Sequence, residues 1–175
     1  MEYTEIMLQD VNKNDIDLII RQELKITKDI VVSSHFFDKS QQKDKEYSEI
    51  DSLANYFSIP NTGNIYTKEI TLGEKLYHVM VVISFDKDFG DITLNFNEDD
   101  ICNCDNKDLN LKLKKVVNKL NEMQQKYNIK NIMLGYESVI DNENIILKIS
   151  NGNKEIINKF KGKLANAIEF VYNQH

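Results

Sequence analysis

The segment Asp86 to Asp91, read DKDFGD, combines three aspartates with a glycine, a composition that calcium-binding loops share. An EF-hand loop needs glycine at its sixth position and glutamate at its twelfth, where this chain has Asp91 and Asn97. Aspartate and glycine are also the residues that tight turns between strands favour. We therefore interpret the segment as a turn and predict no metal site in it.

The two cysteines, Cys102 and Cys104, are the only thiols that could bind a soft metal ion. Zinc sites usually take four ligands, commonly from two pairs, and the chain has no second cysteine pair. The separation of two residues also leaves too little chain for ordinary disulfide geometry. We predict two unbridged thiols in a reducing compartment, with neither a metal nor another cofactor.

His78 lies inside the apolar run LYHVMVVISF, where a hydrogen-bonded core histidine is the expected role. The sequence has no glycine-rich phosphate loop, nucleophile elbow, metalloprotease helix or catalytic cysteine and histidine signature. An active site would therefore lack a named nucleophile, base or metal, and we predict that the protein is not an enzyme. The enzyme alternative would assemble a site from His78, the acids between residues 86 and 100, and tyrosines.

The most distinctive charge pattern is the segment Asp86 to Asp108, which holds eight acidic and two basic side chains. Like charges concentrated on loops steer an oppositely charged partner and raise its association rate. The alternative is a solvated hairpin end followed by a helix-capping loop. The predicted partner-binding residues are Asp86, Asp88, Asp91, Glu98, Asp99 and Asp100.

The net charge of −6 argues against direct nucleic-acid binding, which needs clustered cations. Of 22 basic residues only Arg21 is an arginine, so the planar group that recognises phosphate is almost absent. Residues 1–105 carry 21 acidic and 10 basic side chains, whereas residues 106–175 carry 7 and 12. The acidic N-terminus has no secretory-signal pattern and no apolar run spans a bilayer, so we predict a cytoplasmic protein without membrane contact.

The run Leu76 to Phe85 is apolar at nearly every position, which predicts a central strand covered on both faces. Together with Ile65 to Leu72 and Ile92 to Phe96 it predicts a three-stranded antiparallel meander. A second hairpin is predicted from Asn131 to Tyr136 and Asn144 to Ser150, across a turn at residues 141–143.

The remaining segments predict helices, two strands and a loop. Before the meander we expect a strand at Met1 to Asp10, a helix at Asp15 to Leu24 capped by Asn12 or Asn14, a strand at Asp29 to Phe37, an exposed loop at Asp38 to Lys45 and a helix at Ser48 to Phe57. After it we expect a long helix from Asp108, its cap, to Tyr127, and a last helix that follows the turn Asn151 to Asn153. The prediction is one α+β domain over residues 1–175, with a mostly antiparallel sheet of about five to six strands packed with three to four helices.

A small acidic α+β chain with acidic loops and no catalytic signature resembles the bacterial toxin-immunity proteins in overall character. These proteins share no motif, so the resemblance transfers no residue role to this sequence. It implies that the chain binds and neutralises a cognate toxin protein, with a basic nuclease as the expected partner and a monomer as the expected state.

The element order of residues 48–172 also resembles the small acidic secretion chaperones, which hold an extended segment of an effector protein. Such chaperones are typically dimers, and the strand and helix before Ser48 depart from their pattern. A chaperone is therefore the second functional hypothesis.

Overall fold

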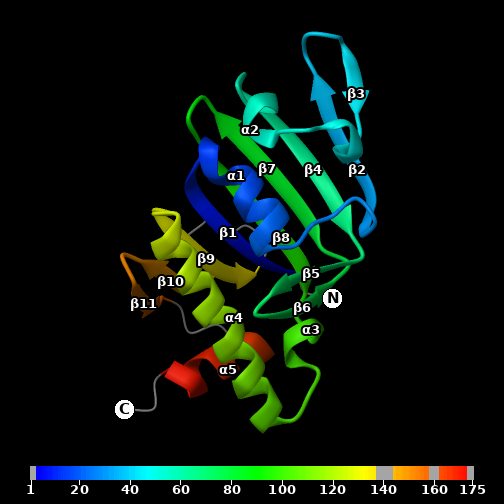
Figure 1. Ribbon diagram of the computed structural model, residues 1–175. Coiled ribbons are helices and arrows are strands. Elements are labelled where there is room, and N and C mark those ends of the chain that lie inside the picture. The colour runs from blue at the N-terminus through cyan, green and yellow to red at the C-terminus, as the bar shows by residue number, and fades with distance from the viewer. Residues whose placement is uncertain (1–2, 137–143, 158–161, 173–175) are drawn as a thin grey trace.

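A nine-stranded antiparallel sheet is the main feature of the computed structural model, which describes residues 3–136, 144–157 and 162–172 (Figure 1). The strand order is β11-β10-β9-β1-β8-β7-β4-β2-β3. The strands are β1 (Tyr3–Asn12), β2 (Val31–Asp38), β3 (Lys43–Lys45), β4 (Asn61–Thr67), β7 (Met80–Asp86), β8 (Phe89–Asn97), β9 (Asn131–Tyr136), β10 (Ile145–Ser150) and β11 (Asn153–Ile156).

The other elements are a two-stranded hairpin and short and long helices. The hairpin consists of β5 (Glu69–Leu72) and β6 (Glu74–Tyr77). The first helical segment joins a 3-10 turn (Lys13–Asp15), α1 (Ile16–Leu18) and a π-helical turn (Ile19–Glu23). The others are a 3-10 turn (Tyr47–Glu49), α2 (Leu53–Tyr56), α3 (Asp99–Cys102), α4 (Asn106–Lys126) and α5 (Lys163–Tyr172). No helix in the described part of the chain has the length and apolar character needed to cross a membrane.

The predicted α+β class is confirmed, but the predicted number of strands is too low. The strands that sequence reasoning missed are short and polar, as in β3, read KDK, and β11, read NKEI. β3 lies within the predicted loop Asp38 to Lys45, and β11 follows the turn where the last helix was expected to begin. Both are edge strands, which pair on one side only and therefore need no apolar alternation.

The apolar run Leu76 to Phe85 is not one strand, and its prediction as a doubly covered strand is wrong. β6 ends at Tyr77 and β7 begins at Met80. Between them the chain changes direction at His78, which has a positive φ of 53°. His78 is exposed rather than in the core, and its N–H donates to the Lys68 carbonyl over 2.9 Å. In β7 itself only Val81, Ile83 and Phe85 are buried, so one face of this strand lies open.

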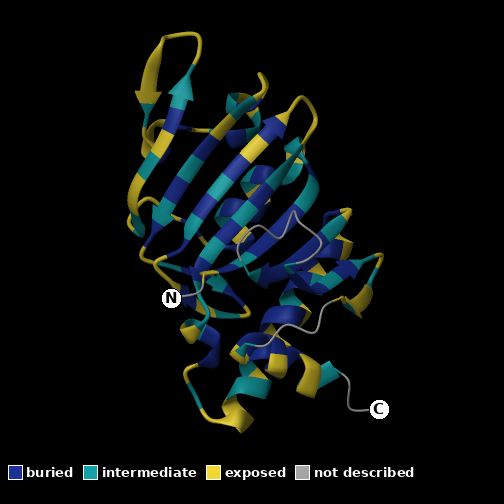
Figure 2. Cartoon of the chain, turned by 180° about the vertical axis from the view of Figure 1, so that it is seen from behind, coloured by how far each residue is buried: buried dark blue, intermediate teal, exposed yellow. Residues whose placement is uncertain are grey.

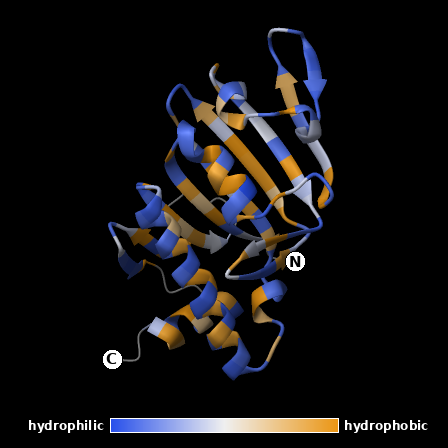
Figure 3. Ribbon diagram, viewed as in Figure 1, coloured by the Kyte–Doolittle hydropathy of each residue, from blue (hydrophilic) through white to orange (hydrophobic). Residues whose placement is uncertain are grey.

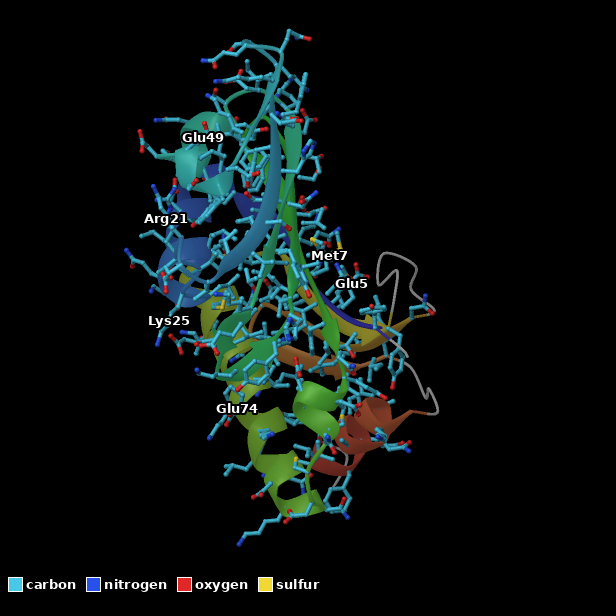
Figure 4. All side chains as sticks on the ribbon, turned by 90° about the vertical axis from the view of Figure 1, so that its right-hand side faces the viewer. Glu5, Met7, Arg21, Lys25, Glu49 and Glu74 are labelled. Atoms are coloured by element: carbon cyan, nitrogen blue, oxygen red, sulfur yellow. The ribbon has the colours of Figure 1, made fainter. Side chains whose placement is uncertain are left out.

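One face of the sheet carries the helices and the core. Figures 1 and 4 show α1, α2 and α4 on the same side of the sheet. Figure 3 shows apolar residues along α1 and the strands behind it. The buried residues of α4 include Leu113, Val116, Val117 and Leu120, whose helical spacing forms one apolar stripe against the core. Figure 2, which views the molecule from behind, shows buried residues alternating with intermediate and exposed ones along the central strands.

The helix ends agree in part with prediction. Asn12 accepts a hydrogen bond from the Asn14 N–H and caps the first helical segment, as expected. The long helix is capped by Asp105 rather than Asp108, since Asp105 accepts the N–H groups of Lys107 and Asp108. The predicted helix Ser48 to Phe57 is interrupted, and only α2 is α-helical. The turn at residues 141–143 and residues 158–161 lie outside the described residues.

Glu23 joins the first helical segment to α4, 103 residues later in the chain. Its carboxylate contacts the Lys119 ammonium at 2.7 Å, the Lys126 ammonium at 2.6 Å and the Tyr127 hydroxyl at 2.6 Å. The Glu23 side chain is only 8% exposed. Burial raises the pKa of Glu23, but these hydrogen bonds outweigh it and lower the pKa to about 2.

We expect Glu23→Gln to lower the free energy of unfolding at pH 7 by about 2–3 kcal/mol, because the native state favours the ionised carboxylate. A carboxylate whose pKa is lower in the folded state stabilises that state by the full amount above its pKa in the unfolded state, near 4.5. This stabilisation decreases as the pH falls toward the folded-state pKa of about 2. Urea denaturation of wild type and variant between pH 7 and pH 3 measures this contribution to the free energy of unfolding. The difference between wild type and variant should narrow below pH 5, and a difference independent of pH would contradict the assignment.

Candidate partner-binding surface

The structure divides the six predicted acids into two groups. Asp86, Asp88 and Asp91, called here the hairpin acids, surround the turn between β7 and β8. Glu98, Asp99 and Asp100, called here the α3 acids, lie where α3 begins. The extended strand β8 separates the groups by about 25 Å, at about 3.3 Å per residue. The structure therefore does not bring the six acids together on one patch.

The hairpin acids differ in their exposure to solvent and in their contacts with other residues of the protein. Asp86 is exposed on the last position of β7. Asp88 is exposed and lies 3.4 Å from the Lys13 ammonium. Asp91 is half-buried and accepts the Asp10 N–H over 2.9 Å, while its burial raises the pKa of its carboxyl. Asp86 and Asp88 thus present their charge to solvent.

The α3 acids hold neighbouring elements in place. Glu98 accepts the Tyr136 hydroxyl at 3.3 Å, and Asp99 lies 3.4 Å from the Lys163 ammonium. Asp100 accepts the Tyr77 N–H over 2.7 Å, and burial raises the pKa of the Asp100 carboxyl. These contacts connect α3 to β6, β9 and α5. Their role as partner-binding residues stays a prediction, with a structural role shown beside it.

The second face of the sheet forms a larger candidate surface, called here the open face. Among the described residues no helix covers it, and Glu5 and Met7 point away from the helical side in Figure 4. Strand pairing assigns its residues, because side chains that oppose one another in a ladder share a face. They include Tyr3, Glu5, Met7, Ser33, His35, Asp44, Thr62, Asn64, Tyr66, Met80, Val82, Ser84, Asp86, Phe89, Asp91, Thr93, Asn95, Met133, Ile145, Lys148 and Glu155. Met7, Met133 and Ile145 are buried and form a small second hydrophobic cluster, so the exposed part of this face is the region of β4, β7 and β8.

The charged residues of the open face are mostly acidic. The set contains one lysine, Lys148, and five carboxylates, which belong to Glu5, Asp44, Asp86, Asp91 and Glu155. On this face the Asp44 carboxylate lies 3.6 Å from His35. The lysines of α4 lie on the helical side instead. The fold therefore gives the open face a surplus of acidic side chains.

The centre of the open face is formed by short polar and medium-sized apolar side chains. Thr93 lies between Met7 and Val82 in the ladder, and Asn95 lies between Glu5 and Met80. The aromatic residues stand toward the ends of the strands. Tyr3 is 47% exposed and Phe89 is 52% exposed, while the Tyr66 ring stacks on His78 with 6.3 Å between centroids.

The residues of the enzyme alternative are brought together only in part. His78 lies near Asp100, with which it interacts electrostatically, and its ring stacks on Tyr66, but the hairpin acids are distant from it. His78 precedes β7 and the hairpin acids follow it, so the seven residues of β7 separate them by about 23 Å. Two cavities of about 340 and 380 Å³ lie elsewhere, one beside α2 and the β2–β3 hairpin and one between the α3–α4 loop and α5. The described residues contain no cluster of three or more side chains suited to a metal ion.

The sequence matches the family model of the PABL017 Cdi1I immunity protein over residues 2–160. This match covers most of the 175 residues. The chain belongs to the Cdi1I immunity protein family. The predicted immunity function is confirmed at this level, and the family match favours it over the chaperone and enzyme hypotheses. None of the curated proteins compared with this Cdi1I family member matches it.

Two solved structures from Pseudomonas aeruginosa share the fold. One is a chain in the 1.75 Å crystal structure of the toxic C-terminal tip of CdiA in complex with immune protein, with a TM-score of 0.66 and 13% identity. The alignment covers 91% of this Cdi1I family member and 99% of that chain. The other is the T6SS protein PA0821, with a TM-score of 0.50, 5% identity, and coverage of 78% of this chain and 42% of that one.

The open face was missed in the sequence analysis, although β8 carries a signal for it. The residues Ile92, Leu94 and Phe96 alternate with polar ones along β8, which indicates one buried and one solvated face. The continuous apolar run in β6 and β7 hid the same alternation, since Met80 and Val82 lie half-exposed on the open face. A half-exposed apolar residue cannot be told from a buried one by its type.

We expect iodoacetamide to label native Cys104 much faster than Cys102 at pH 8. Burial, followed by the Glu98 carboxylate, raises the pKa of the Cys102 thiol to about 12, which lowers its thiolate fraction by about a thousandfold. Cys104 is only half-buried. Mass spectrometry of the Cys104→Ala variant should show no label in the native state and full label in denaturant. Rapid native labelling of that variant would contradict the burial of Cys102.

Proposed function

We propose that this member of the Cdi1I family neutralises a cognate toxin domain by binding it as an intact one-to-one complex. The observation that carries the proposal is the family match over residues 2–160. The likeness to a chain from a complex of a CdiA toxic tip with its immune protein supports it. A monomer that acts in the cytoplasm fits this role, because the inhibitor must be present where the toxin would act.

We further propose that the toxin domain is basic and acts as a nuclease. A protein that binds nucleic acid carries clustered cations, because these displace counterions from the phosphates. The net charge of −6 and the surplus of acids in residues 1–105 would attract such a surface. An acidic inhibitor would then compete with the polyanionic substrate for the same cations.

The hairpin acids are the better candidates for steering the toxin among the six acids. Asp86 is exposed, and Asp88 is 78% exposed with one contact, to Lys13. Glu98 and Asp100 are half-buried with internal partners, and Asp99 is 52% exposed and contacts Lys163. Exposed charges act over a distance set by the salt concentration and chiefly change the association rate. The α3 acids would contribute less to steering and more to folding.

We expect Asp86→Lys combined with Asp88→Lys to slow association with the toxin domain encoded beside this chain by at least about tenfold at about 50 mM salt. The effect should shrink at about 500 mM salt, because screening weakens interactions between exposed charges. Stopped-flow mixing at both salt concentrations measures the rate constants. Asp88 pairs with Lys13 across the turn, so circular dichroism should confirm that the variant keeps its fold.

The matched control combines Asp51→Lys with Glu169→Lys, which changes the net charge equally at two exposed acids away from the hairpin. Its association rate should fall far less. If both double variants slow association equally, net charge rather than the hairpin acids does the steering. If wild type neither binds the toxin nor protects cells from it, the proposed immunity is wrong for this chain.

A further inference from the structure

We infer that the toxin domain docks on the open face of the nine-stranded sheet. This inference rests on the proposed function and specifies the surface that performs it. The six acids predicted from the sequence contribute only two members to this face, Asp86 and Asp91. The centre of the proposed interface is instead formed by β1, β4, β7 and β8.

The open face is large enough for a stable protein complex. Nine strands spaced by about 4.8 Å span about 40 Å, and a strand of seven residues is about 23 Å long. The resulting platform measures about 900 Å². Each partner in a standard protein interface contributes about 800 Å². A toxin domain can therefore bury a full interface on this face without using the helical side.

The open face is also rigid before binding. The ladders β1–β8, β7–β8 and β4–β7 run without a register shift across the centre of the face, and the only shift within them lies near Asp10. Beneath this region the core residues Leu94, Val81 and Ile6 are fully buried. A preorganised surface loses little conformational entropy on binding, which favours tight association. Short side chains such as Ser84 and Thr93 lower that cost further.

The arrangement of residue types across the open face matches the anatomy of protein interfaces. At the centre of such interfaces charged residues are rarer, and aromatic residues and methionine are commoner, than on the rest of the protein surface. The rim of the interface is polar. Met80 and Val82, both half-buried, adjoin Thr93 and Asn95 in the middle of the sheet, whereas Met7 is buried beside them. The aromatic side chains of Tyr3, Tyr66 and Phe89 lie toward the strand ends.

The charge of the open face specifies a cationic partner. The open face carries five carboxylates and one lysine, so it attracts a basic domain and repels an acidic one. On the helical side, α4 carries Lys112, Lys114 and Lys115, but acids such as Glu49 and Glu74 also lie there. The Lys115 ammonium lies 2.6 Å from the Glu74 carboxylate. Outside the open face the described residues carry equal numbers of acidic and basic side chains, so the acidic surplus lies on this face.

The test introduces an arginine on the open face at Ser84, with Ser58→Arg as the matched control. Both serines are exposed, and Ser58 follows α2 on the helical side. Ser84→Arg places a large cation beside Thr62 and Asp91, where a docked basic domain would collide with it. Asn95→Arg provides a second variant at the centre, between Glu5 and Met80.

We expect Ser84→Arg and Asn95→Arg each to weaken binding of the toxin domain encoded beside this chain by at least about a hundredfold, and Ser58→Arg to change it less than about threefold. Calorimetry of the purified full-length proteins measures the dissociation constants. Ser84→Arg and Asn95→Arg should also fail to protect cells that express the toxin, whereas Ser58→Arg should protect them. Thermal unfolding checks that all three variants keep the wild-type fold.

The outcomes separate the inference from the proposed function. Binding that survives both open-face variants, or falls only with Ser58→Arg, overturns the docking surface and leaves immunity standing. Failure of wild type to bind overturns the proposed function itself. A wild-type dimer that Ser84→Arg converts to a monomer in light scattering would show that a second copy occupies the open face, and this also overturns the inference.

Discussion

One-sided burial of the sheet is the constraint on which the rest of the structure depends. The strands β1, β8 and β7 each place one set of apolar side chains under the helices, and the opposite set faces away from them. The core gains its stability by removing this apolar surface from water. The opposite face is held by the ladder hydrogen bonds, and among its described residues it buries only the small cluster Met7, Met133 and Ile145. A surface with these properties is suited to binding a protein.

Polar contacts join the first helical segment to the segment of the 3-10 turn Tyr47–Glu49 and α2. Arg21, the only arginine, contacts Asp17 at 3.1 Å, donates to the Ile50 carbonyl over 2.8 Å and lies over the Tyr47 ring. Asp17 in turn accepts the Leu53 N–H at the start of α2. The planar guanidinium suits this multiple role, since it can donate in several directions at once. The single arginine of the chain therefore makes contacts within the fold.

The acids of the chain divide between folding and recognition according to their surroundings. Glu23 is buried and ionised because three donors surround it, so it contributes to folding. Asp100 and Asp99 hold α3 against β6 and α5. Asp86 is exposed and borders the open face, where its charge remains available to a partner. A count of acidic residues along the chain cannot make this distinction, because it records charge without burial or partners.

The sequence by itself determined the α+β class, the antiparallel meander, the hairpin of β9 and β10, the long helix and the acidic character that resembles immunity proteins. These features follow from local periodicity, short turns and composition, which need no knowledge of distant contacts. Only the tertiary structure decided where the run Leu76 to Phe85 breaks, because the apolar residues on either side of His78 do not show that the chain turns there. It also decided that β8 holds the two groups of acids apart, and that all the covering helices share one side. Sequence proximity gave no information on these points, since an extended strand separates neighbours along the chain while pairing joins residues far apart in it.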